Sequence, residues 1–102
     1  MAVYPGYAET TNASRYLQQL CKHWGHKFEV EFDPSHGRIA FDTDTVCHLD
    51  ADPQGLKLRL EAADPARGEQ MKGVIVAHLV RFAFREELVV KWDEDSSASP
   101  HG

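Results

Sequence analysis

The residues best suited to bind a ligand are a histidine and two arginines in the second half of the chain. His78, Arg81 and Arg85 are separated by three and four residues, a spacing that places side chains along one edge of an α-helix. Such a basic ridge could bind a carboxylate, a phosphate or a catecholate-type ligand through charge-assisted hydrogen bonds. In the alternative, structural interpretation the histidine has a backbone or carboxylate partner, and the arginines pair with Glu86, Glu87 or acids of the strands.

The histidines and cysteines form only a weak metal-binding pattern. His23 and His26 are three residues apart, but Gly25 interrupts the helix between them, so they lack the fixed i, i+4 geometry of a helical zinc pair. Cys47 and His48 are neighbours on a predicted strand and therefore point to opposite faces. His23 and His26 are the weak metal candidates, and we expect neither a metal nor another resident cofactor.

No arrangement of nucleophile and base indicates an enzyme. Cys21 lies in the apolar stripe of a predicted helix, where burial raises the pKa of a thiol, whereas a catalytic cysteine needs an accessible and electropositive setting. The sequence has no glycine-rich phosphate loop, no nucleophile elbow and no evident carboxylate pair. We therefore expect a protein without catalytic activity, in which Cys21 and Cys47 are free thiols.

Two amphipathic segments should form the helices that position these side chains. Residues 13–24 carry apolar side chains at helical spacing, with Asn12 as a candidate N-cap and Gly25 as the residue that ends the helix. The same stripe recurs from Met71 to Phe82. Because Asp64-Pro65 resembles an N-cap followed by proline at the first helical position, this second helix should begin near residue 65.

The second helix is apolar on nearly every side. Val76, Val80 and Ala83 lie opposite the stripe assigned to the core. Helices that are apolar all round are normally buried, so the sequence predicts a homodimer, or a docked partner, through these three residues. The alternative is an exposed patch of small apolar residues, which monomeric proteins commonly show.

Alternation of apolar and polar residues with a period of two marks the strands. It predicts strands within residues 7–11, 28–32, 39–41, 45–51, 56–60 and 88–92. Strands with one polar face are typical of antiparallel sheets, so both helices should cover the apolar face. The predicted fold is an α+β two-layer sandwich with a mainly antiparallel sheet, two helices on one face and the order β-α-β-β-β-β-α-β.

The chain of 102 residues is long enough for one hydrophobic core. We place a single domain at residues 1–92 and treat residues 93–102, which are acidic and rich in serine, as a disordered tail. The absence of an apolar run near ~20 residues excludes a membrane span, and the lack of a secretory signal pattern indicates the cytoplasm. With 11 basic and 16 acidic residues interspersed, a nucleic-acid partner is disfavoured.

Two segments resemble a bacterial family. They are residues 13–27, ASRYLQQLCKHWGHK, and residues 78–88, HLVRFAFREEL, with Trp92 following. Together they are similar to the family called domain of unknown function 2218, over roughly residues 7–92. Val80 departs from the pattern, in which a charged residue is expected between the leucine and the arginine. The resemblance implies a cytoplasmic bacterial protein and carries over no catalytic residue.

The family is also associated with siderophore-interacting, flavin-dependent ferric reductases. The resemblance therefore implies an accessory or ligand-binding part in siderophore and iron utilisation, with an iron siderophore or such a reductase as the partner. The alternative hypothesis is a homodimeric interaction module that acts through the apolar outer face of the second helix and has no small-molecule ligand.

Overall fold

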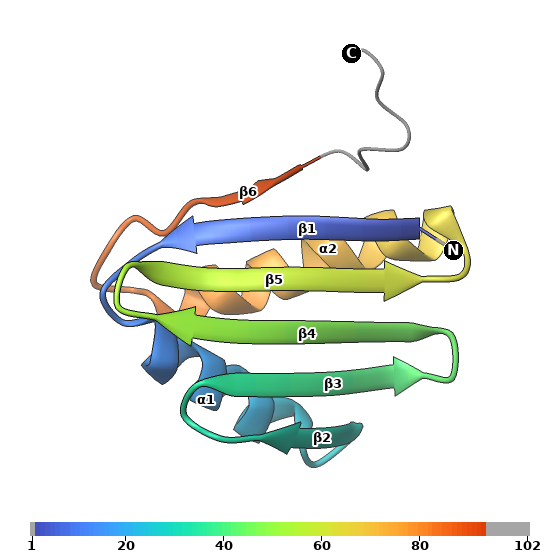
Figure 1. Ribbon diagram of the computed structural model, residues 1–102, viewed down its shortest axis with the longest axis horizontal. Coiled ribbons are helices and arrows are strands. Elements are labelled where there is room, and N and C mark those ends of the chain that lie inside the picture. The colour runs from blue at the N-terminus through green and yellow to red at the C-terminus, as the bar shows by residue number, and fades with distance from the viewer. Residues whose placement is uncertain (1, 94–102) are drawn as a thin grey trace.

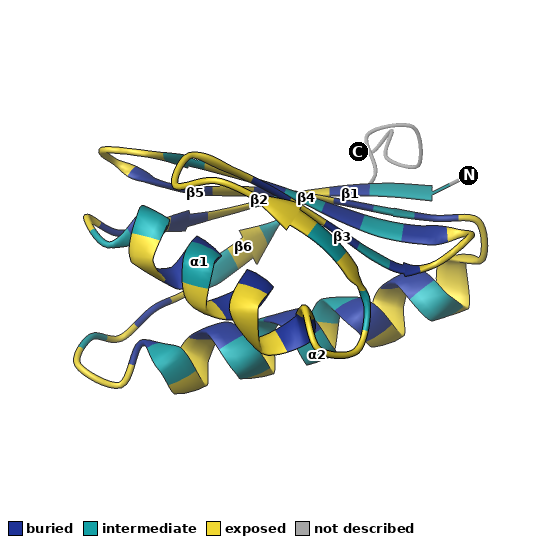
Figure 2. Ribbon diagram, turned by 90° about the horizontal axis from the view of Figure 1, so that it is seen from below, coloured by how far each residue is buried: buried dark blue, intermediate teal, exposed yellow. Residues whose placement is uncertain are grey.

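A computed structural model describes residues 2–93 of the chain. Its elements are β1 (Ala2–Glu9), α1 (Ala13–Trp24), β2 (Glu29–Phe32), β3 (His36–Asp42), β4 (Thr45–Asp52), β5 (Gly55–Ala62), α2 (Pro65–Phe82) and β6 (Val90–Trp92). One layer is a sheet and the other consists of α1 and α2, which lie on the same face of that sheet (Figure 2). The predicted two-layer α+β sandwich and its element order are confirmed.

The six strands form one antiparallel sheet in the order β2-β3-β4-β5-β1-β6 (Figure 1). Strands β2 to β5 are joined by consecutive hairpins. The first strand of the chain, β1, pairs with β5 along its whole length. The register sets Leu49 opposite Leu58 and Cys47 opposite Leu60, so apolar side chains of neighbouring strands share the face beneath the helices. No helix or strand within residues 2–93 covers the other face of the sheet.

The core lies between the sheet and the two helices. Burying one leucine or isoleucine side chain fully stabilises a fold by about 1.5–3 kcal/mol, so the fully buried aliphatic residues contribute much of the driving force. They are Leu17, Leu20, Ile39, Leu49, Leu56, Leu60, Ile75 and Leu79. Phe32, at the end of the strand predicted within residues 28–32, is 40% exposed because β2 is a short strand at the edge of the sheet.

The start of α2 follows the prediction. The Asp64 side chain accepts a hydrogen bond from the backbone N–H of Ala66 at 3.0 Å, and Pro65 occupies the first helical position. Asn12 precedes α1 as predicted, but its side chain does not cap that helix. It donates instead to Glu86 at 3.1 Å, so its amide joins the start of α1 to the segment after α2.

The first strand begins earlier than predicted. The sequence predicts a strand within residues 7–11, yet β1 already includes Pro5-Gly6, a pair that favours turns, because pairing with β5 from Ala2 to Glu9 outweighs this local propensity. Gly6 is needed there for packing, since a Cβ atom at this position would lie 2.7 Å from Cε3 of Trp92. In the sheet, β1 lies between β5 and β6 and pairs with both.

Residues 94–102, most of the predicted tail, lie outside the described residues. Within residues 2–93, no helix has the length and apolar character needed to cross a membrane.

Candidate functional site

A single carboxylate joins the start of α1 to the segment that follows α2. Oε2 of Glu86 accepts hydrogen bonds from Thr10 Oγ1 at 3.0 Å, from Asn12 Nδ2 at 3.1 Å and from the Tyr16 hydroxyl. The bonds from Tyr16 and Asn12 are the main cause that lowers the pKa of Glu86. Burial, followed by the bond to Glu86, raises the pKa of Tyr16. The ionised form of Glu86 is therefore the form that this network stabilises.

A cavity of about 260 Å³ lies beside this network. It is lined by Asn12, Arg15, Tyr16, Gln19, Phe82, Phe84 and Arg85. Arg15 comes from α1 and Arg85 from the turn after α2. Among residues 2–93, neither guanidinium has a carboxylate within ion-pair distance. We call this the junction cavity.

The proposed basic ridge does not form as one helical edge. Because α2 ends at Phe82, the helical spacing does not extend to Arg85, which lines the junction cavity instead. Nδ1 of His78 donates to the Val74 carbonyl at 2.8 Å, as the structural interpretation of this histidine expects. Arg81 is exposed and does not line the cavity.

The weak metal candidates lie near the end of α1. The ring of His23 is 5.1 Å from that of His78 and 5.9 Å from that of Phe82, measured between centroids. His26 is exposed in the turn after Trp24. In the described part of the chain, no group of three or more histidine, cysteine or acidic side chains could hold a metal ion.

Cys21 and Cys47 are buried free thiols. Burial raises the pKa of Cys21 to about 11. Burial and the neighbouring Cys21 raise the pKa of Cys47 even further. At neutral pH both groups are therefore protonated, and they serve as small apolar side chains of the core.

The three residues assigned to an outer face of α2 differ in exposure. Val80 is 45% exposed, Val76 is half-buried and Ala83 is buried. Ala83 follows the last helical residue and packs inward, so it does not belong to an exposed surface. Phe84, which is 78% exposed, is the large apolar side chain that lies open beside it.

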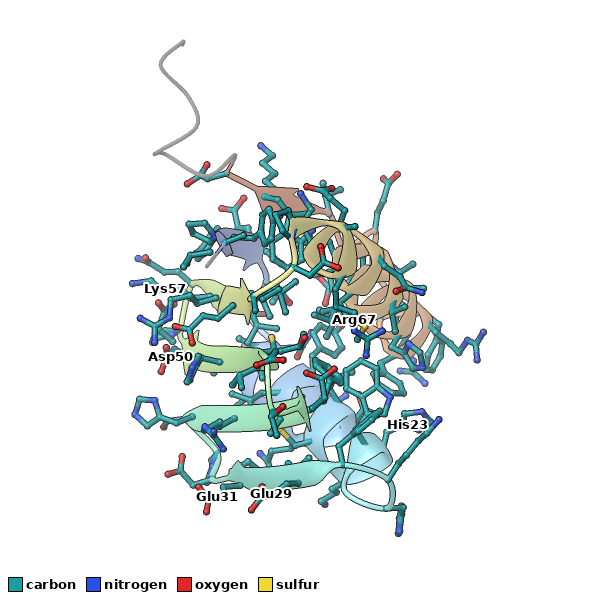
Figure 3. The ribbon with its side chains drawn as sticks, turned by 90° about the vertical axis from the view of Figure 1, so that its right-hand side faces the viewer. His23, Glu29, Glu31, Asp50, Lys57 and Arg67 are labelled. Atoms are coloured by element: carbon teal, nitrogen blue, oxygen red, sulfur yellow. The ribbon has the colours of Figure 1, made fainter. Side chains whose placement is uncertain are left out.

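The uncovered face of the sheet has a second and larger hollow, a groove of about 800 Å³. Figure 3 shows Asp50 and Lys57 projecting from the sheet away from the helices, whereas Arg67 and His23 lie on the helical side. The groove is lined by Pro5, Gly6, Tyr7, Glu31, Phe32, Asp33, His36, Gly37, Arg38, His48, Leu49, Asp50, Lys57, Leu58 and Arg59. We call it the sheet groove.

Basic side chains follow one another across the sheet groove. The register places His48 between Arg38 and Arg59 on three adjacent strands. Nε of Arg59 lies 3.2 Å from Glu61, and Nε2 of His48 lies 3.6 Å from the same carboxylate. This leaves Arg38 uncommitted, because none of its contacts within residues 2–93 is an ion pair.

Lys57 is the second cation of the sheet groove without a carboxylate partner among the described residues. Its register partner Asp50 contacts Nδ1 of His36. The sequence predicted a polar sheet face, but not this site. The sequence feature that could have indicated the site is the set of basic residues at alternate positions in 36–38 and 57–59. These residues form a cluster only when the strand register is known.

Comparison with known proteins gives a family and a solved relative. Residues 6–93 match the family described as "Uncharacterized protein conserved in bacteria (DUF2218)". No curated protein matches the chain. The NMR structure of PA4090 from Pseudomonas aeruginosa is similar, with 39% sequence identity and a TM-score of 0.78 over 93% of this chain and 98% of that one.

Proposed function

The chain belongs to the bacterial DUF2218 family, and we propose that it is a non-enzymatic ligand-binding domain that takes an acidic ligand in the sheet groove. One observation carries this proposal: a groove of about 800 Å³ on the uncovered sheet face contains Arg38 and Lys57, which have no carboxylate partners among the described residues. Concave sites with a few convergent polar groups are where proteins commonly bind small molecules.

Size supports a ligand of several rings or chelating arms. Sites for such ligands typically measure about 300–1,000 Å³, a range that includes the groove but not the junction cavity of about 260 Å³. An iron siderophore belongs to this size class and is the ligand that the family resemblance implies. We therefore propose an accessory role in siderophore and iron utilisation, in the cytoplasm, with a siderophore-interacting reductase as the protein partner.

Charge supports an acidic rather than a neutral chelate. Arg38 of β3 is in line with Arg59 of β5, and Lys57 lies two residues before Arg59, so the backbones of Arg38 and Lys57 are about 12 Å apart and a ligand with separated anionic groups can contact both. The acid beside Lys57 is engaged by His36, and backbone N–H groups of Ser35 and His36 donate to Asp33. Glu31, which lies opposite Arg38 on the edge strand β2 without forming an ion pair with it, is the acid that most directly opposes this proposal.

Calorimetric titration with three ferric chelates tests the function. We expect an anionic tris-catecholate and ferric citrate to bind, and a neutral tris-hydroxamate to bind at least about tenfold more weakly, a difference of about 1.4 kcal/mol. Added salt should weaken the two anionic complexes. Equal affinity for all three chelates, or no binding, would overturn the proposal.

Two substitutions assign the binding to the groove. Arg38→Gln and Lys57→Gln each remove a charge-assisted hydrogen bond, so each should weaken the anionic chelates by about tenfold or more. Lys22→Gln is the matched control, because Lys22 is an exposed cation of α1 outside the groove lining. An equal loss in the control would indicate general charge attraction instead of a site.

The exposed apolar side chains of the helical layer favour homodimerisation as the second candidate function. Val80 is 45% and Phe84 78% exposed, so both are available to a partner. Light scattering at high concentration should give the mass of a dimer, and Val80→Glu should give that of a monomer. A monomer mass for the parent protein rejects this candidate.

A further inference from the structure

We propose that the junction cavity is a separate binding site for a small aromatic carboxylate, whose acid group is held between Arg15 and Arg85. The proposal does not depend on the sheet groove, since the two cavities share no lining residue. It also differs from the helical ridge, because its second cation comes from α1 and Arg81 has no part in it.

The acid group is the first element of recognition. Arg15 and Arg85 line the cavity from segments about 70 residues apart, and neither has an acidic partner in the described chain. Guanidinium groups form strong, often bidentate hydrogen bonds with carboxylates. The amide of Gln19 is a further polar group of the lining, whereas Asn12 and Tyr16 already donate to Glu86.

The aromatic ring is the second element. Phe82, Phe84 and Tyr16 belong to the lining, and Phe84 is 78% exposed. Cζ of Arg85 lies 5.5 Å from the centroid of the Phe84 ring, so the guanidinium already faces an aromatic group. A ligand that joins a carboxylate to a ring matches a lining that joins guanidinium groups to rings, and ring pairs stabilise a complex beyond simple burial.

Size limits the ligand to one ring. A cavity of about 260 Å³ lies below the range for drug-sized ligands, so a chelate of several arms does not fit. Benzoate, with a single ring and a single carboxylate, is therefore the appropriate probe.

Glu86 pre-organises this site. It is the neighbour of Arg85 in sequence, and three donors from Thr10, Asn12 and Tyr16 hold its carboxylate. The segment that carries Arg85 is thus anchored before a ligand arrives, which lowers the entropy cost of binding. Glu86 is the acid beside this site; it does not line the cavity, and its carboxylate accepts from Thr10, Asn12 and Tyr16.

Titration followed by two-dimensional NMR tests the proposal. Benzoate, cyclohexanecarboxylate, acetate and inorganic phosphate are added to the full chain. We expect benzoate to bind most tightly and to shift the signals of Arg15, Gln19 and Phe84, while the signals of Arg38 and Lys57 stay unchanged. Equal affinity for benzoate and acetate, or shifts spread over the sheet groove, would overturn the proposal.

Three arginine variants separate the cavity from the ridge. Arg15→Gln and Arg85→Gln should each weaken benzoate by about tenfold or more, through the lost charge-assisted hydrogen bonds. Arg81→Gln should leave the affinity unchanged. The ridge interpretation requires the opposite for Arg15 and Arg81, so a loss at Arg81 with none at Arg15 would reject the junction cavity as the site.

Phe84→Leu tests the aromatic contribution. The side chain is largely exposed, so leucine leaves the fold intact while it removes the ring. We expect the preference for benzoate over cyclohexanecarboxylate to disappear, with the acetate affinity unchanged. A preference that survives in this variant would show that Phe84 does not recognise the ring and would leave the assignment of an aromatic ligand without its main support.

Discussion

The junction cavity and the sheet groove bring cations together in different ways. In the junction cavity, Arg15 and Arg85 meet because the Glu86 network joins segments that are distant in sequence. In the sheet groove, Arg38 and Lys57 are placed by strand register, which many backbone hydrogen bonds share. The first arrangement therefore depends on one carboxylate, and the second on the sheet as a whole. The two sites should respond differently to substitution.

The largest effect should come from the core that supports both sites. Leu20 is fully buried in α1, so Leu20→Ala leaves a cavity and should lower the free energy of unfolding by about 2–5 kcal/mol. Urea denaturation measures the loss. A loss below half a kcal/mol would show that the burial of α1 is misassigned and would remove the basis for treating the two sites as parts of one domain.

Glu86→Gln should break the junction cavity and spare the groove. The change keeps the size of the side chain but removes its charge, and it weakens three hydrogen bonds, so we expect a loss of about 1–3 kcal/mol in stability. Benzoate affinity should fall because the segment that carries Arg85 is no longer anchored, while chelate binding to the groove continues. Denaturation and the two titrations measure these effects. Loss of benzoate binding and of chelate binding together would contradict the independence of the two sites.

The pH dependence of stability should also reveal the contribution of the Glu86 network. The pKa of Glu86 is lowered in the folded protein, so its contribution is present above the unfolded pKa of about 4.3 and is lost as pH falls through the folded value. Unfolding measured between neutral pH and pH 3 should show a steeper loss in the parent than in Glu86→Gln. Identical slopes would mean that the network does not favour the ionised carboxylate.

The sequence predicted the helices and most strands, but not which side chains the fold brings together. Periods of 3.6 and two residues identify α1, α2 and the central strands because each is a local property of the chain. The predicted start of the first strand at residue 7 was too late, because pairing with β5 extends β1 back through Pro5-Gly6 to Ala2. The spacing of His78, Arg81 and Arg85 assumed a helix that continues, yet α2 ends at Phe82.

Both cavities depend on contacts that no local pattern contains. Nothing near Arg85 in the sequence indicates Arg15 as its neighbour, since that contact follows from the way the segment after α2 meets α1. The hydrogen bonds of Glu86 are the physical cause, and they join residues more than 60 positions apart. In the groove, the alternation predicted which residues face away from the helices, but the pairing of His48 with Arg38 and Arg59 required the register.

The smallest effect on stability is expected for arginines that bind a ligand but do not stabilise the fold. Arg15→Gln and Arg38→Gln replace arginines that have no acidic partner in the described residues, so each should change the free energy of unfolding by less than about half a kcal/mol. Each should nevertheless weaken its own ligand, benzoate for the first and an anionic chelate for the second. Urea denaturation beside the two titrations gives both quantities for each variant. A stability loss above about 1 kcal/mol with unchanged affinity would show that the arginine stabilises the fold and does not bind the ligand. Only the other cavity would then remain a binding site.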